Sequence, residues 1–578
     1  MKWWSTFKEA IAKHALKQPD YNTQSEVIGC DVAPQTWGPF ADIGASCQDT
    51  TSTSTPRHRA TRNTESISII QTTTICFNDN AASDDKTMCS TDGPEWPLHF
   101  LAPLFPPTPT PLVIVLFTLG LAINTGFMVG SGYALDIAGP GGVLVAYGLS
   151  ILAMYYVITS LAEIVCQARP GEVLFTFGPG FIKNQSVGFA LRWNYFLSWV
   201  TAAAYHFTAV GTTAGFWFTQ SSHASSIFGL CALFASFIAI VFSLRIYHCA
   251  ELTVSALTIA AFVVCIVMGV SIVRGSIGND KEYGTANMDD TPGGAFNNGI
   301  LGIMSACVIS SFPVQGTEVA AVMISGTRNP VKNIRRISLI VLLGLLVLFI
   351  ASTFVASLVV PYNDTRMLDR SDEDMAYSPL TVMFSESGVM SAAHAINTVV
   401  LVEGLFNACT SLFIASRLLF TFSCHSFAPR WLLRLQYRGG PVLCILAAMA
   451  VVLMIWCVCL IRRSSSLIVL SGVSAYTGFI SWGAIAVIHI TSRMRLQDCR
   501  QPPRKLAYKS IVFPLGPIYC LAFISVASVC QLYISVYDGF DMRGFLSTCL
   551  GYLIFASLCI GAHLFYSTRR FDRVPITM

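Results

Sequence analysis

Two glycine-containing stretches interrupt apolar segments and carry the most specific chemistry in this chain. The first covers residues 123–132 (INTGFMVGSG) and the second residues 311–318 (SFPVQGTE). A helix that unwinds inside a membrane exposes main-chain N–H groups on one side of the break and C=O groups on the other. N–H groups bind a carboxylate and carbonyls bind an ammonium, so paired breaks suit a zwitterionic solute without a full protein charge.

A second interpretation of the first stretch is close packing between helices. Gly126, Gly130 and Gly132 would then only let neighbouring helices approach each other. The second stretch, with Pro313 and Gly316, lies at the matching place five apolar segments later. Matched interruptions of this kind are typical of inverted-repeat transporters with a substrate site at mid-bilayer. We therefore favour a binding site, while close packing stays open.

Several polar residues lie within the apolar segments. A carboxylate such as Glu318 costs about 2.5–3.5 kcal/mol in a membrane on insertion scales and usually serves function; the alternative is a structural hydrogen bond between helices. Glu163 and Glu403 could each be structural. We expect Arg417 to extend to the inner face. We expect His206 to be a satisfied packing residue rather than a ligand, because no pattern of partners surrounds it.

The motifs of common enzymes and metal sites are missing from the sequence. It contains no HExxH, no His/Cys spacing that suits zinc, no CxxC pair and no nucleophile elbow. Most cysteines lie in apolar runs, where cysteine behaves as a small apolar residue. We predict no metal, no cofactor and no enzymatic activity.

The composition indicates which elements must position these residues. Of 578 residues, 53% are hydrophobic and 12% are charged, with a formal net charge of +4. Soluble domains contain about 25% charged residues, and a soluble globule of this size still needs a polar surface. This excludes a nucleic-acid-binding protein, a coiled coil and a disordered chain, and it favours an all-α polytopic protein in contact with membrane lipids.

Apolar segments, most of about 20 residues or more, follow one another from residue 112 and could each cross a bilayer. We predict a transmembrane domain over residues 112–566, preceded by a largely disordered cytoplasmic region (1–111) rich in Ser, Thr and Pro and followed by a cytoplasmic tail (567–578). The twelve predicted helices cover residues 112–135, 141–166, 187–219, 227–245, 251–273, 298–324, 336–360, 390–423, 441–461, 467–491, 511–537 and 544–566.

The charge distribution orients this map. Most Lys and Arg residues of the loops fall on one side, which places both termini in the cytoplasm, and the opposite loops collect acidic residues. A glycosylation sequon at Asn363 then lies in an outer loop, whereas a second sequon at Asn184 lies inside and should be silent.

The same stretches, with further motifs in a fixed order, resemble the fungal amino-acid permeases, the yeast amino-acid transporter branch of the amino acid–polyamine–organocation superfamily. The resemblance runs from about Leu119 to Phe565. The matching motifs are INTGFMVGSG (123–132), GPGG (139–142), LAE (161–163), RWNY (192–195), FPVQGTE (312–318), GTRNP (326–330), and Asn407 with ASR (415–417).

The resemblance implies a LeuT-like five-plus-five inverted repeat with two additional helices, and proton-coupled uptake of amino acids across the plasma membrane. Carried over by position, Thr125 and Gly126 would bind the substrate carboxylate. Phe312 would be an aromatic lid, and the carbonyls of Gly316 and Thr317 would face the ammonium group.

The resemblance also implies coupling or gating residues, namely Glu318, Asn407 and Thr258. Asn124 stands where the family has a glycine, which would crowd the approach to the backbone, and Arg192 replaces another glycine. Thr258 occupies a position where the family usually carries a lysine that mimics a bound sodium ion.

Two functions from different classes stay open on the sequence. The first is a secondary amino-acid symporter that works by alternating access. The second, motivated by Asn124 and Thr258, is an amino-acid-sensing receptor built on a transporter scaffold with weak or no transport. A membrane-embedded enzyme is not supported, because its motifs are missing.

Overall fold

The computed structural model describes most of the chain from Pro109 onward, and every described residue belongs to the compact unit Thr72–Met578. The predicted N-terminal region lies outside the described residues except for residues 109–111, and the predicted tail does so after residue 571. The described residues are 109–166, 184–217, 222–242, 244–279, 281–289, 294–367, 378–425, 427–437, 440–461, 466–498, 508–537 and 542–571.

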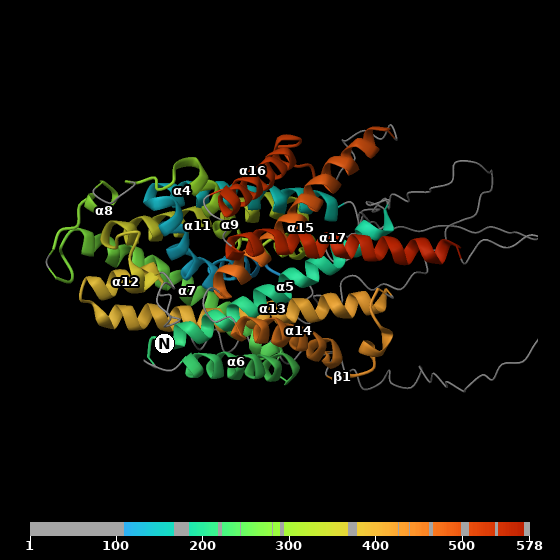
Figure 1. Ribbon diagram of the computed structural model, residues 1–578, viewed down its shortest axis with the longest axis horizontal. Coiled ribbons are helices and arrows are strands. Elements are labelled where there is room, and N and C mark those ends of the chain that lie inside the picture. The colour runs from blue at the N-terminus through green and yellow to red at the C-terminus, as the bar shows by residue number, and fades with distance from the viewer. Residues whose placement is uncertain are drawn as a thin grey trace, which may run out of the picture. The chain divides into compact units, whose positions relative to one another are not determined.

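The regular secondary structure of the described residues is helical, apart from two short antiparallel strands, β1 (Gln436–Tyr437) and β2 (Gly440–Pro441) (Figure 1). The helices are α2 (Pro111–Ala122), α3 (Thr125–Met128), α4 (Gly130–Val165), α5 (Gln185–Ala214), α6 (Ser222–Phe242), α7 (Leu244–Val273), α8 (Ala286–Asp289), α9 (Gly299–Ser311), α10 (Val319–Ser325), α11 (Pro330–Val359), η2 (Thr365–Met367), α12 (Pro379–Glu386), α13 (Met390–Cys424), η3 (Arg430–Leu433), α14 (Val442–Ile461), α15 (Ser466–Asp498), α16 (Leu515–Tyr537) and α17 (Met542–Phe571).

The longer helices fall where the apolar segments predict them, with ends that differ by several residues, whereas α8, η2, α12 and η3 lie between the predicted segments. Within the described chain, seven helices are long and apolar enough to cross a membrane, and four shorter helices are apolar as well. The all-helical class is therefore confirmed, whereas the count of twelve crossings stays a prediction.

The first predicted segment is broken where its glycines indicate. Helix α2 ends at Ala122 and α3 begins at Thr125, with Asn124 in an extended conformation (φ −103°, ψ 177°) between them. The Asn124 side chain caps α3, because its Oδ1 accepts a hydrogen bond from the amide of Phe127 (3.2 Å). The Phe127 ring then stacks on Phe349 of α11 at 3.8 Å between centroids, which fixes α3 against the core.

The turn between the first and second predicted segments depends on Gly139. This residue has a φ of 73° inside α4, so α4 is two helices that meet at Gly139 and Pro140. A Cβ on Gly139 would lie 2.8 Å from the main-chain nitrogen of Asn297, so only glycine fits.

The sixth predicted segment is broken as well. Helix α9 ends at Ser311 and α10 begins at Val319, and the residues between them form turns. Gly316 adopts a left-handed conformation in this break (φ 88°), which favours glycine. Both expected interruptions are thus present in the structure.

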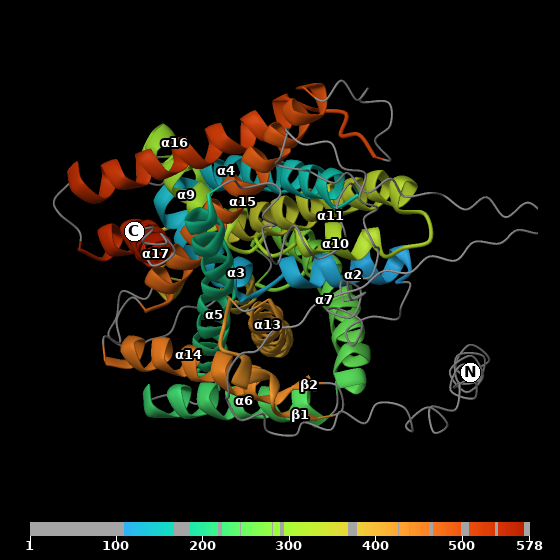
Figure 2. The same ribbon diagram turned by 90° about the vertical axis from the view of Figure 1, so that its right-hand side faces the viewer.

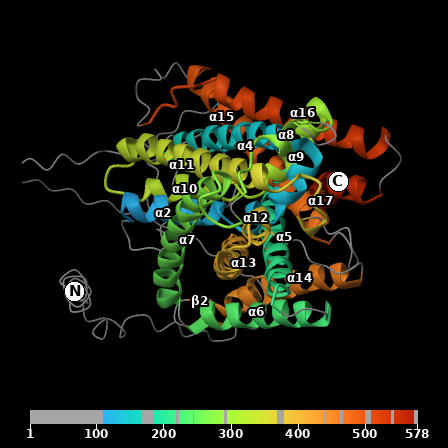
Figure 3. The ribbon, with the colours of Figure 1, turned by 90° about the vertical axis from the view of Figure 1, so that its left-hand side faces the viewer.

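Helix α13 runs between α5 and α7. Figures 2 and 3 view the helices from opposite sides, and both show α13 end-on with α5 on one side and α7 on the other. Helix α2 packs on α7 and α11, and α4 packs on α9, α11 and α16. The first interrupted helix therefore lies beside α7, with α3 also against α5 and α13, whereas the second lies against α4, α15 and α16.

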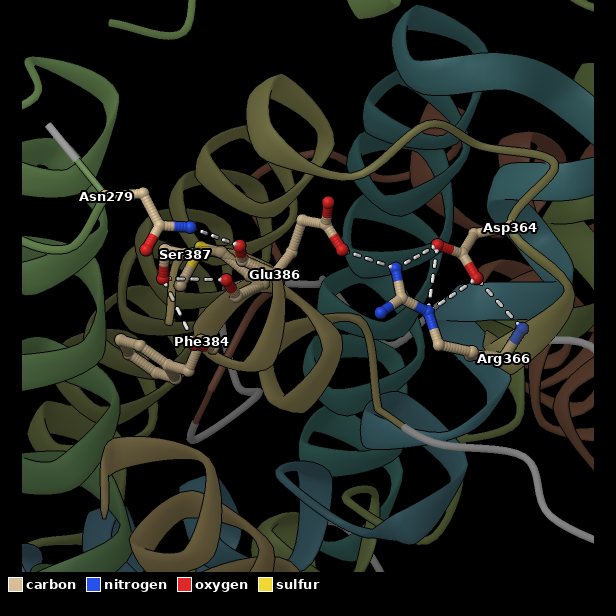
Figure 4. A network of polar contacts seen from close by, with 7 residues as sticks. Asn279, Asp364, Arg366, Phe384, Glu386 and Ser387 are labelled. Atoms are coloured by element: carbon tan, nitrogen blue, oxygen red, sulfur yellow. Dashed lines mark hydrogen bonds and ion pairs between the residues drawn. The ribbon is translucent and has the colours of Figure 1, made fainter. Parts of the chain in front are cut away.

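A network of polar contacts ties the connection after α11 to α12 (Figure 4). The Arg366 guanidinium pairs with Asp364 (2.6 Å) and with Glu386 (2.9 Å), and the Asn279 amide donates to the main-chain oxygen of Glu386 (3.2 Å). Partial burial favours the neutral acid at Asp364, but the hydrogen bonds from Arg366 outweigh it and hold the pKa of this carboxyl below its usual value.

Candidate functional site

The two helix breaks contact each other directly. The Asn124 side-chain amide donates to the carbonyl of Pro313 in the second break (3.1 Å) and to that of Leu121 at the end of α2 (2.9 Å). The Phe312 ring covers Gly126, because a Cβ there would lie 2.6 Å from two atoms of the ring. Residues 189 positions apart, Asn124 and Pro313, thus join the interruptions into one site.

Helix α5 forms a third wall of the site. The Thr125 hydroxyl and His206 Nδ1 are 2.7 Å apart, and the Tyr205 hydroxyl donates to the main-chain oxygen of Thr125 (3.4 Å). Tyr205 packs edge-on against Phe312 at 4.7 Å between centroids, and His206 stacks near the same ring at 5.9 Å. His206 is buried and its ring nitrogen is hydrogen-bonded, as a satisfied packing residue would be, and its partner is a site residue on another helix.

Glu318 holds the second break in shape. Its Oε2 accepts hydrogen bonds from the amide of Gly316 (2.9 Å) and from Nε1 of Trp482 (3.3 Å), and its Oε1 accepts from the Tyr195 hydroxyl (3.2 Å). The Thr317 hydroxyl donates to the carbonyl of Val314 within the same turn (2.6 Å). The carboxylate therefore links the break to α5 and α15 while it stays buried.

A cavity of about 30 Å³ lies between the breaks, α5 and α15. Phe312, Gly316 and Glu318 line it together with Asn124 and His206, whereas Thr125, Gly126 and Thr317 are not among its lining residues in the described chain. Such a volume holds about two or three water molecules. The breaks are therefore closed on one another in this structure.

A much wider space opens at one end of the helices. This vestibule has a volume of about 780 Å³ and lies where α9, α15 and α17 begin and α16 ends. Tyr205 is one of its lining residues. The same tyrosine packs on Phe312, which lines the small cavity. The vestibule has the size of a ligand pocket.

The opposite end is closed by buried charges. Glu163 at the end of α4 accepts hydrogen bonds from the Arg493 guanidinium and from the amide of Ser510 (2.7 Å), and His489 Nε2 lies 3.2 Å from the same carboxylate. Nearby, the Arg192 guanidinium lies over the Phe427 ring at 3.8 Å. Glu163 thus serves as the centre of an ion-paired contact between α4 and α15.

Arg417 does not reach a surface. Its side chain is only 4% exposed, and its guanidinium lies 5.0 Å from the centroid of Phe413 on the same helix. The prediction that it extends to the inner face is wrong, because neighbouring helices bury this part of α13.

The other two predicted coupling residues gather around a carboxylate that the sequence singled out only weakly. The Thr258 hydroxyl on α7 donates to Oε2 of Glu403 on α13 (2.9 Å). The Asn407 amide donates to Oε1 of Glu403 (3.2 Å) and approaches the carbonyl of Gly120 in α2 (3.5 Å). Thr258, Glu403 and Asn407 therefore form a polar cluster distinct from the cavity residues.

Interrupted helices that meet at a small cavity, together with a wide vestibule at one end of the helices, define a multi-pass membrane transporter. The profile of the family described as "Amino acid permease" matches residues 113–574. The chain belongs to this family. Its function is therefore amino acid transport, and it is not an enzyme.

Relatives of the chain come from both bacteria and fungi. It is 28% identical to the lysine-specific permease LysP of Escherichia coli over 458 residues, which cover 79% of this chain and 92% of the relative. It is 25% identical to the general amino-acid permease GAP1 of Saccharomyces cerevisiae over 462 residues, which cover 78% of this chain and 75% of the relative. The resemblance to permeases is confirmed, but it is not specific to fungi.

A solved structure of a variant manganese transporter from Eremococcus coleocola aligns with 83% of this chain and 97% of its own length. Its sequence identity is 13% and its TM-score is 0.46, so this likeness supports no functional argument.

Proposed function

We propose that the chain is a proton-coupled amino-acid symporter of the plasma membrane that works by alternating access. The observation that carries this proposal is the direct contact of two helix breaks, Asn124 to Pro313 at 3.1 Å, beside a small cavity. Broken membrane helices present main-chain groups where a substrate binds. An amino acid carries both charges that such groups attract.

The substrate carboxylate is assigned to the main chain at Thr125 and Gly126, because the first amides of a helix have no acceptor within it. The ammonium group is assigned to the carbonyls of Gly316 and Thr317 in the opposite break. Phe312 acts as the lid. The support for this assignment is its position, since the ring covers Gly126 and faces the cavity.

Alternating access is supported by the contrast between the two ends. The vestibule gives the site one open approach, and the buried pair of Glu163 with Arg493 closes the other. With the N-terminus in the cytoplasm, the vestibule faces outward and the structure corresponds to an outward-facing state. Transport then requires the Glu163 contact to separate as the vestibule closes.

The membrane arrangement belongs to the same proposal. It consists of twelve crossings in two inverted groups of five plus two further helices, over residues 112–566, with residues 1–111 and 567–578 in the cytoplasm. The interrupted helices support it, because each is the first helix of its group of five. Membrane lipids surround the apolar helices, and protons drive uptake.

A second candidate function is an amino-acid receptor with weak or no transport. The observation that favours it is the Asn124 side chain, which bridges the two breaks beside a cavity too small for an amino acid. A receptor would bind its ligand without accumulating it.

Uptake measurements separate these functions. Radiolabelled amino acids are offered to a permease-deficient yeast that expresses the chain, at external pH values from acidic to neutral, with a panel of unlabelled competitors. Saturable accumulation that increases at acidic pH supports the symporter. Saturable binding to isolated membranes without accumulation supports the receptor, and neither binding nor uptake of any amino acid contradicts both.

A further inference from the structure

Four carboxylates are buried among the described residues, and their partners differ: Glu163, Glu251, Glu318 and Glu403. Glu163 has the arginine and histidine described above, and Glu251 lies 3.6 Å from His248 Nδ1. Within the described chain, Glu318 and Glu403 form no ion pair. A buried carboxylate without a cation is costly when ionised, so these two are candidates for binding a proton.

The partners of Glu318 suit a carboxylate that stays ionised. Its Oε2 accepts from the amide of Gly316 and from the indole of Trp482, and both groups can only donate. A proton on Oε2 would point at two donors and would break the turn that holds Gly316. Oε1 faces the Tyr195 hydroxyl, which can donate or accept as Thr258 can for Glu403. Because the two donors on Oε2 tie Glu318 to the turn, we assign it a structural role in the break.

The partners of Glu403 accept either protonation state. The ionised carboxylate accepts from the Thr258 hydroxyl at Oε2 and from the Asn407 amide at Oε1. A hydroxyl both donates and accepts. When Oε2 is protonated, Thr258 can rotate its hydrogen away and accept the new O–H, while the Asn407 bond to Oε1 persists. Glu403 can therefore gain and lose a proton while both of its oxygens keep a hydrogen-bond partner.

Glu403 also adjoins the substrate site through the main chain. The next residue, Gly404, packs so closely on the first break that a Cβ would lie 2.5 Å from Cγ2 of Thr125. Asn407, one turn along α13, approaches the carbonyl of Gly120, which lies four residues before Asn124. A change of charge on Glu403 acts on α13 at its contact with α2 and α3.

A second polar layer lies about 10 Å further along both helices, since seven residues rise about 10.5 Å. There Thr410 of α13 donates to Glu251 of α7, and the Tyr247 hydroxyl contacts Thr410 at 2.6 Å. Going from Thr258 to Glu251 on α7, or from Glu403 to Thr410 on α13, leads toward the end that Glu163 closes. The α7–α13 interface thus carries titratable groups from the level of the break toward the inner side.

We infer that Glu403 is the carboxylate that binds the coupling proton, held by Thr258 and Asn407, and this rests on the proposed symport. The proton arrives from outside, forms an O–H bond at Oε2 of Glu403 and is released to the inner side as the carboxylate reforms, with the amino acid chemically unchanged. The titratable groups facing this position are Glu251 and His248 from α7 and, behind Thr125, His206 from α5. Helices α2 and α3 contribute no titratable side chain.

The test uses the full chain, purified and reconstituted in liposomes. Two activities are measured with a labelled amino acid: exchange against unlabelled amino acid at equal pH, and accumulation driven by a pH gradient. In Glu403→Gln we expect amino-acid exchange to persist and to become independent of pH. A pH gradient should no longer raise the amino-acid concentration inside the liposomes above that outside. Glu282→Gln, an exposed carboxylate in the connection after α7, is the matched control and keeps both activities.

The outcomes separate this inference from the proposed function. If the unmodified chain does not accumulate substrate with a pH gradient, the symport proposal fails. If the unmodified chain accumulates substrate and Glu403→Gln does so equally well, Glu403 is not the coupling group and the inference is overturned.

Thr258→Val provides a second test of the inference, which can be made even if the Glu403→Gln variant does not fold. It removes the hydroxyl that serves both protonation states and leaves the carboxylate in place. We expect it to move the pH at which gradient-driven uptake is half-maximal. A pH profile identical to that of the unmodified chain would overturn the inference.

Discussion

Asn124 is the position where a single substitution should strengthen substrate binding. Its amide connects the carbonyls of Leu121 and Pro313 across the gap between the breaks, and it lines the cavity. An amino acid must separate these breaks to enter a space of about 30 Å³. Each binding event therefore breaks the bond from Asn124 to Pro313. Replacing Asn124 with glycine removes this obstacle before the substrate arrives.

The size of the effect follows from the bonds involved. One hydrogen bond contributes about 0.5–1.5 kcal/mol net, which corresponds to roughly a 2- to 12-fold change in an equilibrium constant. The cap on the Phe127 amide is lost too, but glycine is tolerated at an N-cap at a cost of a few tenths of a kcal/mol. We expect Asn124→Gly to lower the substrate concentration for half-maximal uptake by roughly 2- to 12-fold.

Concentration-dependent uptake in the permease-deficient yeast measures this change, with surface protein quantified in parallel. Asn124→Ala is the matched variant. It also loses the bridge, but it keeps a Cβ and a poorer cap, which costs about 0.5–2 kcal/mol of helix stability. It should gain less than Asn124→Gly. A half-saturation concentration that is unchanged or higher in Asn124→Gly, at normal surface level, would refute the reasoning that the bridge opposes binding.

Three further experiments test other parts of the structure. Glu318→Gln should reduce uptake at least tenfold at unchanged surface level, because hydrogen bonds to a charged acceptor contribute about 1.5–3 kcal/mol each; normal uptake kinetics would exclude this role. Arg493→Met should lower the melting temperature of the purified protein, since an unpaired buried Glu163 costs about 3–5 kcal/mol, and adding Glu163→Gln should restore part of it. In yeast, Asn363→Gln should remove a glycan that glycosidase treatment also removes, whereas Asn184→Gln should leave gel mobility unchanged, and the opposite result would reverse the topology.

The helix breaks could be predicted from the sequence because they depend on local main-chain chemistry. Gly316 adopts a left-handed conformation and Gly126 leaves room for an aromatic ring, so the local structure requires glycine at both positions. The length of the apolar segments is likewise set by the thickness of the membrane. These are the features that the structure reproduces.

Contacts between distant helices could not be predicted in this way. Nothing near His206 indicates that Thr125, 81 positions earlier, lies 2.7 Å from its ring nitrogen. The burial of Arg417 depends equally on neighbours that approach from other helices. Asn124 was expected to crowd the backbone, and its actual partner, the carbonyl of Pro313, becomes visible only when the two breaks meet.

In the polar cluster between α7 and α13, the resemblance to the family assigns the coupling role to Thr258. We propose that the residue facing it, Glu403, has this role. A comparison by position directs attention to Thr258, which has no charge to exchange. The Thr258 hydroxyl lies 2.9 Å from Glu403, so a longer cationic side chain at position 258 would pair with this carboxylate and keep it ionised. With threonine there, the donors that contact Glu403 in the described part of the chain are neutral. In the mechanism that we propose, the threonine at position 258 and the buried carboxylate on α13 thus explain each other, and the exchangeable proton belongs to α13.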